Sequence, residues 1–179
     1  ALGHTNEARE YETKESLARE RLESLLWNAQ LGRFIYYKDR YDTEHLDGQY
    51  HTFSWPAIYG FSDVMGKYSS IRHMADTLVS PQGLIYVSNN FPGHMAQTTG
   101  CQEGAVQTPI AAWGFAAGGM RENGAAMFES FGDLVMSQTN QGCYPETAGM
   151  PGTWFSPTAS FYIEAVIEGL FGARWTDDG

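Results

Sequence analysis

The stretch PIAAWGFAAGGM at residues 109–120 decides the predicted fold, because it describes a helix that is buried nearly all round. It contains no charged side chain and consists mainly of glycine, alanine and aromatic residues. Two other stretches have a similar form and are also poor in charge: PAIYGFSDVMGK at 56–67 and PTASFYIEAVIEGL at 157–170. Glycine inside a helix costs up to about 1 kcal/mol relative to alanine, so its repeated use implies that neighbouring backbones come close.

Each of these stretches opens with a proline. Proline suits the first position of a helix, where its missing N–H costs no hydrogen bond. We therefore expect buried helices that begin at Pro56, Pro109 and Pro157, with Thr108 and Ser156 as the N-caps of the last two.

A charged, amphipathic helix precedes each buried one. Leucines at helical spacing alternate with charges from about residue 6 to 27, and similar apolar patterns run over 69–79 and 121–138. The chain therefore divides into three helical hairpins, approximately 6–67, 68–119 and 120–172. Hairpins of this kind commonly close into a ring of six, so we predict an all-α fold that forms about half of an (α/α)6 toroid. Another chain or a missing N-terminal segment would complete the ring; the alternative is a free-standing bundle of about six helices.

Composition excludes several classes of function as first choices. The chain has 179 residues and a formal net charge of −10, the opposite of what phosphate binding requires, and no stretch is long and apolar enough to span a membrane. The histidines show no metal-binding spacing and no nucleotide fingerprint is present, so we expect neither a metal nor a cofactor. Cys101 and Cys143 could form one bridge or stay free, which leaves the compartment undecided.

The long connections between outer and buried helices are expected to carry the site, beside the N-terminal ends of the buried helices. They concentrate acids, amides and flat aromatic rings, which together suit a sugar: polar groups bond its hydroxyls and rings cover its C–H face. Glycoside hydrolysis takes two carboxyl groups, for which Glu146 and Glu103 are the candidates. The predicted substrate-binding residues are Asp39, Asp42, Trp55, Tyr59, Gln102, Tyr144 and Trp154.

Two other classes of function stay open. His45, His51 and His94 could move protons in a polysaccharide lyase or a sugar epimerase built on the same toroid. A non-catalytic carbohydrate-binding or scaffold subunit is the third hypothesis.

The third hairpin also resembles a known clan. Its residues YPETAG at 144–149, followed by WFSPTA at 154–159, look like the end of the six-hairpin (α/α)6 glycosidase domains of trehalases and processing α-glucosidases. The resemblance implies that Glu146 is the general base of an inverting hydrolysis and that the general acid is an aspartate in the earlier half of the toroid. Pro157 stands where the clan has tryptophan, and Gln102 and Glu103 lie where it has an aromatic and arginine-containing stretch, so the resemblance implies no particular sugar.

Overall fold

The computed structural model describes residues 4–46, 48–61, 64–87, 105–137, 144–145 and 155–173. These residues are mostly helical, which confirms the predicted all-α class. The helices are α1 (Thr5–Leu26), α2 (Tyr50–Ile58), α3 (Val64–Leu78), α4 (Gln107–Ala117), α5 (Arg121–Met136) and α6 (Ser156–Glu164), and α6 continues as a π-helix, η1 (Ala165–Leu170).

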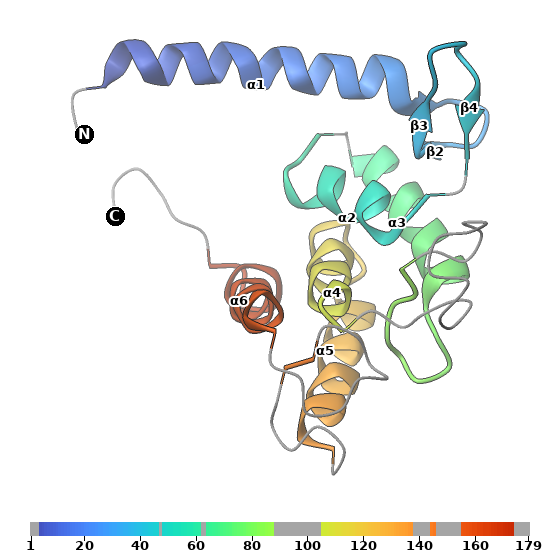
Figure 1. Ribbon diagram of the computed structural model, residues 1–179, viewed down its shortest axis with the longest axis vertical. Coiled ribbons are helices and arrows are strands. Elements are labelled where there is room, and N and C mark those ends of the chain that lie inside the picture. The colour runs from blue at the N-terminus through green and yellow to red at the C-terminus, as the bar shows by residue number, and fades with distance from the viewer. Residues whose placement is uncertain are drawn as a thin grey trace.

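Helix α4 lies at the centre of the molecule (Figure 1). It packs against α2 on one side, α6 and η1 on another and α5 on a third, while α3 packs on α2. Its residues from Thr108 to Phe115 are all buried, as the apolar pattern predicts. The large apolar side chains of the core come from α2, α3, α4 and α5 and include Phe53, Ile71, Met74, Phe115, Met127 and Phe128.

Glycines let the helices approach this closely, as the sequence implied. A Cβ atom added to Gly114 of α4 would lie 2.8 Å from the Cβ of Ser54 in α2. One added to Gly169 of η1 would lie 2.8 Å from Cδ1 of Trp113 in α4. Both distances are shorter than real contacts of a Cβ atom, so larger residues at these positions would push the helices apart.

The predicted start of the first buried helix is wrong. Helix α2 begins at Tyr50, and Pro56 lies inside it rather than at its first position. The start is set by Gln49, whose backbone N–H donates to Oγ1 of Thr52 over 3.2 Å. The predicted N-caps are also displaced, because Thr108 and Ser156 lie within the first turns of α4 and α6 while Val106 and Phe155 hold the cap positions.

The predicted helix over 56–67 is two elements in the structure. Gly60 adopts a φ of +69°, and the N–H of Phe61 donates to the carbonyl of Pro56 over 2.8 Å, which closes the end of α2. Helix α3 then begins at Val64 and continues through the predicted outer helix 69–79 to Leu78.

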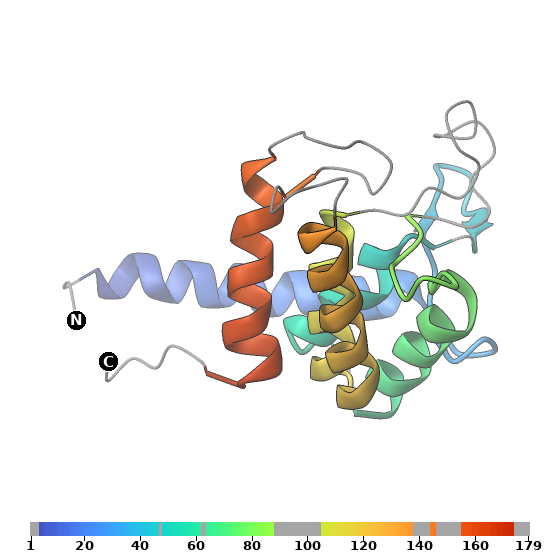
Figure 2. The ribbon, with the colours of Figure 1, turned by 90° about the horizontal axis from the view of Figure 1, so that it is seen from below.

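The first turns of α2 and α4 meet at the segment 85–87. The N–H of Tyr50 donates to the carbonyl of Val87 over 3.4 Å, and the N–H of Ile85 donates to Oγ1 of Thr108 over 3.2 Å. Figure 2 shows α4 and α6 running in one direction with α5 running in the other. The N-terminal ends of α4 and α6 therefore point to the same end of the molecule.

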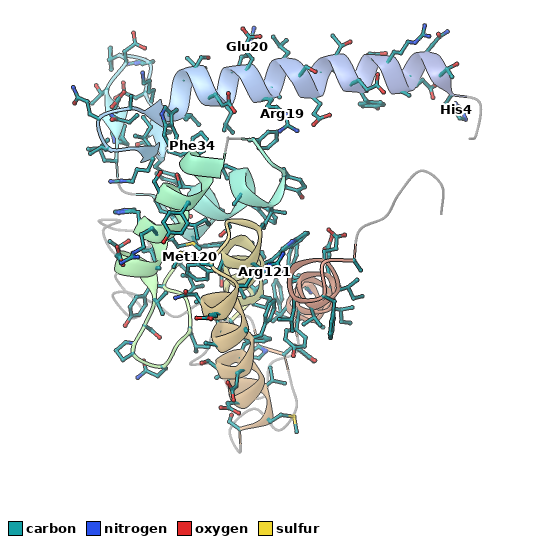
Figure 3. The ribbon with its side chains drawn as sticks, turned by 180° about the vertical axis from the view of Figure 1, so that it is seen from behind. His4, Arg19, Glu20, Phe34, Met120 and Arg121 are labelled. Atoms are coloured by element: carbon teal, nitrogen blue, oxygen red, sulfur yellow. The ribbon has the colours of Figure 1, made fainter. Side chains whose placement is uncertain are left out.

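Helix α1 lies outside this body and none of its residues is buried. Its C-terminal half is attached through Arg19, which donates to the carbonyl of Gly60 and lies 4.9 Å from the ring of Phe61. Figure 3 shows Arg19 pointing toward the body and Glu20 pointing away from it. The predicted loop after α1 contains two short antiparallel pairs, β1 (Trp27–Asn28) with β2 (Arg33–Phe34), and β3 (Tyr37–Lys38) with β4 (Glu44–His45).

Candidate functional site

Five aromatic and imidazole rings form a continuous row between the β3–β4 pair and the first turn of α2. We call His45, Tyr37, Tyr36, His51 and Tyr50 the aromatic row. The Tyr37 and His45 rings are stacked 4.1 Å apart and 8° from parallel, because β pairing sets these two residues opposite each other. The remaining neighbours meet edge to face, with ring centroids 5.2–5.9 Å apart.

Asp39 holds the outer end of the aromatic row. Its Oδ1 accepts hydrogen bonds from the backbone N–H groups of Tyr41 at 2.8 Å and Thr43 at 3.0 Å, and its Oδ2 lies 3.3 Å from Nε2 of His45. The two backbone hydrogen bonds are the main reason why the pKa of Asp39 is lowered, and His45 adds to the effect. The carboxylate is therefore ionised at neutral pH and orients the imidazole of His45.

His51 is the half-buried histidine at the α2 end of the aromatic row. Burial lowers its pKa, so the imidazole is neutral at pH 7 and offers one donor and one acceptor nitrogen. Burial also raises the pKa of its neighbour Tyr50, which keeps that phenol protonated. The rings of Tyr36 and Tyr50 flank the imidazole and fix its orientation.

A cleft of about 200 Å³ opens between α1, α2 and the segment that joins β2 to β3. Its lining is predominantly apolar, and Arg19 holds α1 in position along one side. The lining residues are Leu22 and Leu26 of α1, Phe34 at the end of β2, Ile35 and Tyr36 of the joining segment, and His51, Thr52, Trp55 and Pro56 of α2.

Two of the predicted sugar-binding residues lie together on α2. The rings of Trp55 and Tyr59 are stacked at 5.6 Å with an angle of 27°, and Trp55 lies 6.5 Å from Phe161 of α6. Trp55 also lines the cleft, whereas Tyr59 exposes 56% of its surface. Of the two rings, that of Tyr59 therefore presents its face to solvent beside the cleft.

Tyr144 lies elsewhere, in a small apolar cluster between α5 and α6. Its ring is 5.9 Å from that of Tyr162 and 6.3 Å from that of Phe131. Its carbonyl accepts a hydrogen bond from the N–H of Phe155, and the carbonyl of Pro145 accepts one from Oγ1 of Thr158, both over 2.9 Å. This packing ties residues 144–145 to the first turn of α6.

The structure thus brings together only some of the predicted site residues. Asp39 joins the cleft through the aromatic row, and Trp55 and Tyr59 join it through α2. Asp42 lies in the turn between β3 and β4 with a φ of +60° and an exposed side chain. Glu103, Glu146, Gln102 and Trp154 lie outside the described residues.

Sequence reasoning did not include Tyr36 and Tyr37 among the substrate-binding residues. The density of rings over residues 36–51 was the signal that could have found them. Pairing between β3 and β4, which the sequence did not predict, is what stacks Tyr37 on His45.

Over the residues that the structure describes, no three His, Cys, Asp or Glu side chains come together as metal ligands. Among the same residues, no helix has both the length and the apolar character needed to cross a bilayer.

Comparison with known proteins adds no relative. No protein-family model matches the chain, and no curated protein matches it significantly.

Proposed function

We propose that this chain forms three hairpins of an (α/α)6 toroid and hydrolyses a glycosidic bond, with Glu146 as the base that activates water. The observation that carries the proposal is the row of α2, α4 and α6, with α3 packed on α2 and α5 packed on α4. Adjacent parallel inner helices backed by outer helices are the arrangement that such a ring requires. Another chain or further residues would complete the ring.

The contacts at the N-terminal ends of α2, α4 and α6 support a site at that end of the helices. Segment 85–87 touches the first turns of α2 and α4, and Thr158 in the first turn of α6 bonds to Pro145, the residue directly before Glu146 in the sequence. Helix N-terminal ends favour anionic groups nearby. A carboxylate that acts as a general base is suited to such surroundings.

The carboxylate at the outer end of the aromatic row also supports a sugar as the substrate. An ionised Asp39, which the aromatic row links to the first turn of α2, accepts hydrogen bonds from hydroxyl groups. Glu103 would supply a second carboxyl group near the sugar. In the clan that the sequence resembles, the general acid belongs to the earlier half of the ring, so the catalytic pair would be shared between the two halves.

The test is turnover of a panel of oligosaccharides that differ in sugar and linkage by the protein with its ring complete. The variant Glu146→Gln should lose activity by about 10²–10⁴-fold, because it removes the general base but keeps the shape of the side chain. The matched control is Glu129→Gln on the exposed face of α5, which should leave turnover unchanged. Equal activity in the wild type and in Glu146→Gln would overturn the assignment.

A second candidate function rests on the aromatic row itself. The Asp39–His45 pair and the neutral His51 beside Tyr36 supply the groups that a polysaccharide lyase or sugar epimerase uses to move protons. In that case His51→Ala would abolish turnover and Glu146→Gln would not. A non-catalytic carbohydrate-binding subunit would bind sugar and release no product in any variant.

A further inference from the structure

We propose that the cleft between α1 and α2 is a binding site for a small aryl alcohol, a single aromatic ring that carries one hydroxyl group. This inference does not depend on the proposed glycosidase activity. It follows from the size of the cleft, the absence of charge among the described residues that line it and the position of one imidazole.

The volume of the cleft sets the size of the ligand. An engineered apolar cavity of about 150 Å³ is enough to hold benzene. A cleft of about 200 Å³ therefore holds one ring with a small substituent. It is too small for a disaccharide.

The lining sets the ligand's polarity. Leucine, isoleucine and aromatic side chains cover most of the cleft, and among the described residues that line it none is a carboxylate or a cation. Among the same described residues, polar atoms belong to the side chains of Tyr36, His51, Thr52 and Trp55. The indole N–H of Trp55 can only donate, and Oγ1 of Thr52 already accepts a hydrogen bond from the N–H of Gln49. A pyranose would bring several hydroxyl groups into this lining with too few partners, which is costly.

The ring of His51 provides the single polar contact that such a ligand needs. The rings of Tyr36 and Tyr50 meet the imidazole of His51 edge to face at 5.9 and 5.2 Å, and His51 itself lines the cleft. A neutral imidazole accepts a hydrogen bond from a phenolic hydroxyl. A preformed apolar site with one fixed polar group is the usual design of a small-molecule pocket.

Helix α1 is a structural part of this cleft. Leu22 and Leu26 form one wall, and Arg19 holds that half of α1 against the turn after α2. Phe34, labelled in Figure 3, lies beneath the C-terminal end of α1 and is only 1% exposed. The buried ring of Phe34 therefore forms the base of the cleft, and a substitution at Leu22 alters its wall.

The experiment titrates the protein with phenol and follows binding by NMR and calorimetry. We expect a Kd of about 1 mM, together with intermolecular NOEs from the phenol ring to Trp55 and Leu22. Cyclohexanol, which has the same hydroxyl group and ring size but no aromatic face, should bind several-fold more weakly. Glucose should neither bind in the cleft nor displace phenol.

Three variants complete the test. Leu22→Trp fills the cleft and should abolish phenol binding, while Leu25→Trp, at an exposed position on the same helix, should leave it unchanged. His51→Phe keeps a ring but removes the acceptor nitrogen and should weaken binding about three- to tenfold. Unchanged binding in a folded Leu22→Trp protein, NOEs to residues outside the cleft, displacement of phenol by glucose, or no binding to the wild type would each overturn the proposal.

Discussion

Helices α4 and α1 are the two extremes of this molecule. Helix α4 has eight buried residues out of 11, whereas none of the 22 residues of α1 is buried. Helix α4 consists of small and aromatic residues that pack against three neighbours, while α1 carries exposed ion pairs such as Lys14 with Glu10 at 2.6 Å. The difference shows that residue composition, rather than helical periodicity, distinguishes the buried helices of the body from the exposed helix α1, which we call the arm.

The largest expected effect comes from emptying the core around α4. Phe115 is fully buried, so Phe115→Ala should lower the free energy of unfolding by about 3–5 kcal/mol. The matched change on α1 is Leu17→Ala, where the side chain is 48% exposed and the expected change is within about 0.5 kcal/mol. Urea unfolding of both variants measures the contrast, and similar losses in the two would contradict the distinction between body and arm.

A second prediction concerns the contact between α4 and α2. Gly114→Ala places a methyl group 2.8 Å from Ser54 and should destabilise the protein by about 1–3 kcal/mol. In Gly132→Ala, also in a helix, the added Cβ meets nothing within 4 Å, so the variant should be more stable by up to about 1 kcal/mol. Thermal unfolding compares the two, and a stabilised Gly114→Ala protein would show that the helices are not in close contact.

A third prediction concerns pH, because two half-buried histidines belong to the body. Burial lowers the pKa of His51 and of His73, and the positive charge of Arg33 lowers that of His73 further while Asp76 opposes the shift. The unfolded chain, with a histidine pKa of about 6.5, therefore binds protons before the folded chain does. Stability should fall as the pH drops from 7 through 6.5 toward 5.

The control for this prediction separates these histidines from other groups. Replacing both by glutamine should flatten the stability profile between pH 7 and 5, whereas His4→Gln, at the exposed start of α1, should not. Asp39 has a lowered pKa and contributes to the pH dependence only at more acidic values. A profile that stays steep in the double variant would assign the loss of stability to other groups.

The smallest expected effect lies on α1. Glu10→Gln removes the exposed ion pair with Lys14, which is worth about 0.3–0.5 kcal/mol at most. The unfolding midpoint of the protein should hardly change, and hydrogen exchange should show slightly faster opening in α1 alone. A loss of more than 1 kcal/mol would mean that α1 belongs to the cooperative core.

Much of the helical fold could be predicted, because burial and exposure leave clear patterns of residue type. The predicted outer helix over 121–138 matches α5, and its apolar residues Met127, Phe128, Phe131 and Val135 are all buried. The end of α2 was missed because Gly60 was taken as a helical residue, although glycine also adopts the positive φ that closes a helix. The predicted helix start at Pro56 was wrong for a related reason. Packing and the cap at Gln49 outweigh the preference of proline for the first turn of a helix.

The site was less predictable, because it depends on contacts between distant segments. Asp39 was named from its place in an acidic loop, but its bond to His45 requires the tight turn in which Asp42 has a positive φ. The cleft needs α1 to lie against α2, and the Arg19 contact that fixes it joins residues about forty positions apart. Local sequence carries no signal for such a contact.

The most direct test of the central claim, glycoside hydrolysis by a helical ring, is the identity of the first product. From the oligosaccharide of such a panel that it cleaves, the protein with its ring complete should release a saturated sugar with inverted configuration at the anomeric carbon, as proton NMR can follow in real time. The same experiment with Glu146→Gln should show no release on that timescale. An unsaturated or epimerised product, a retained configuration, or unchanged release by Glu146→Gln would contradict the account.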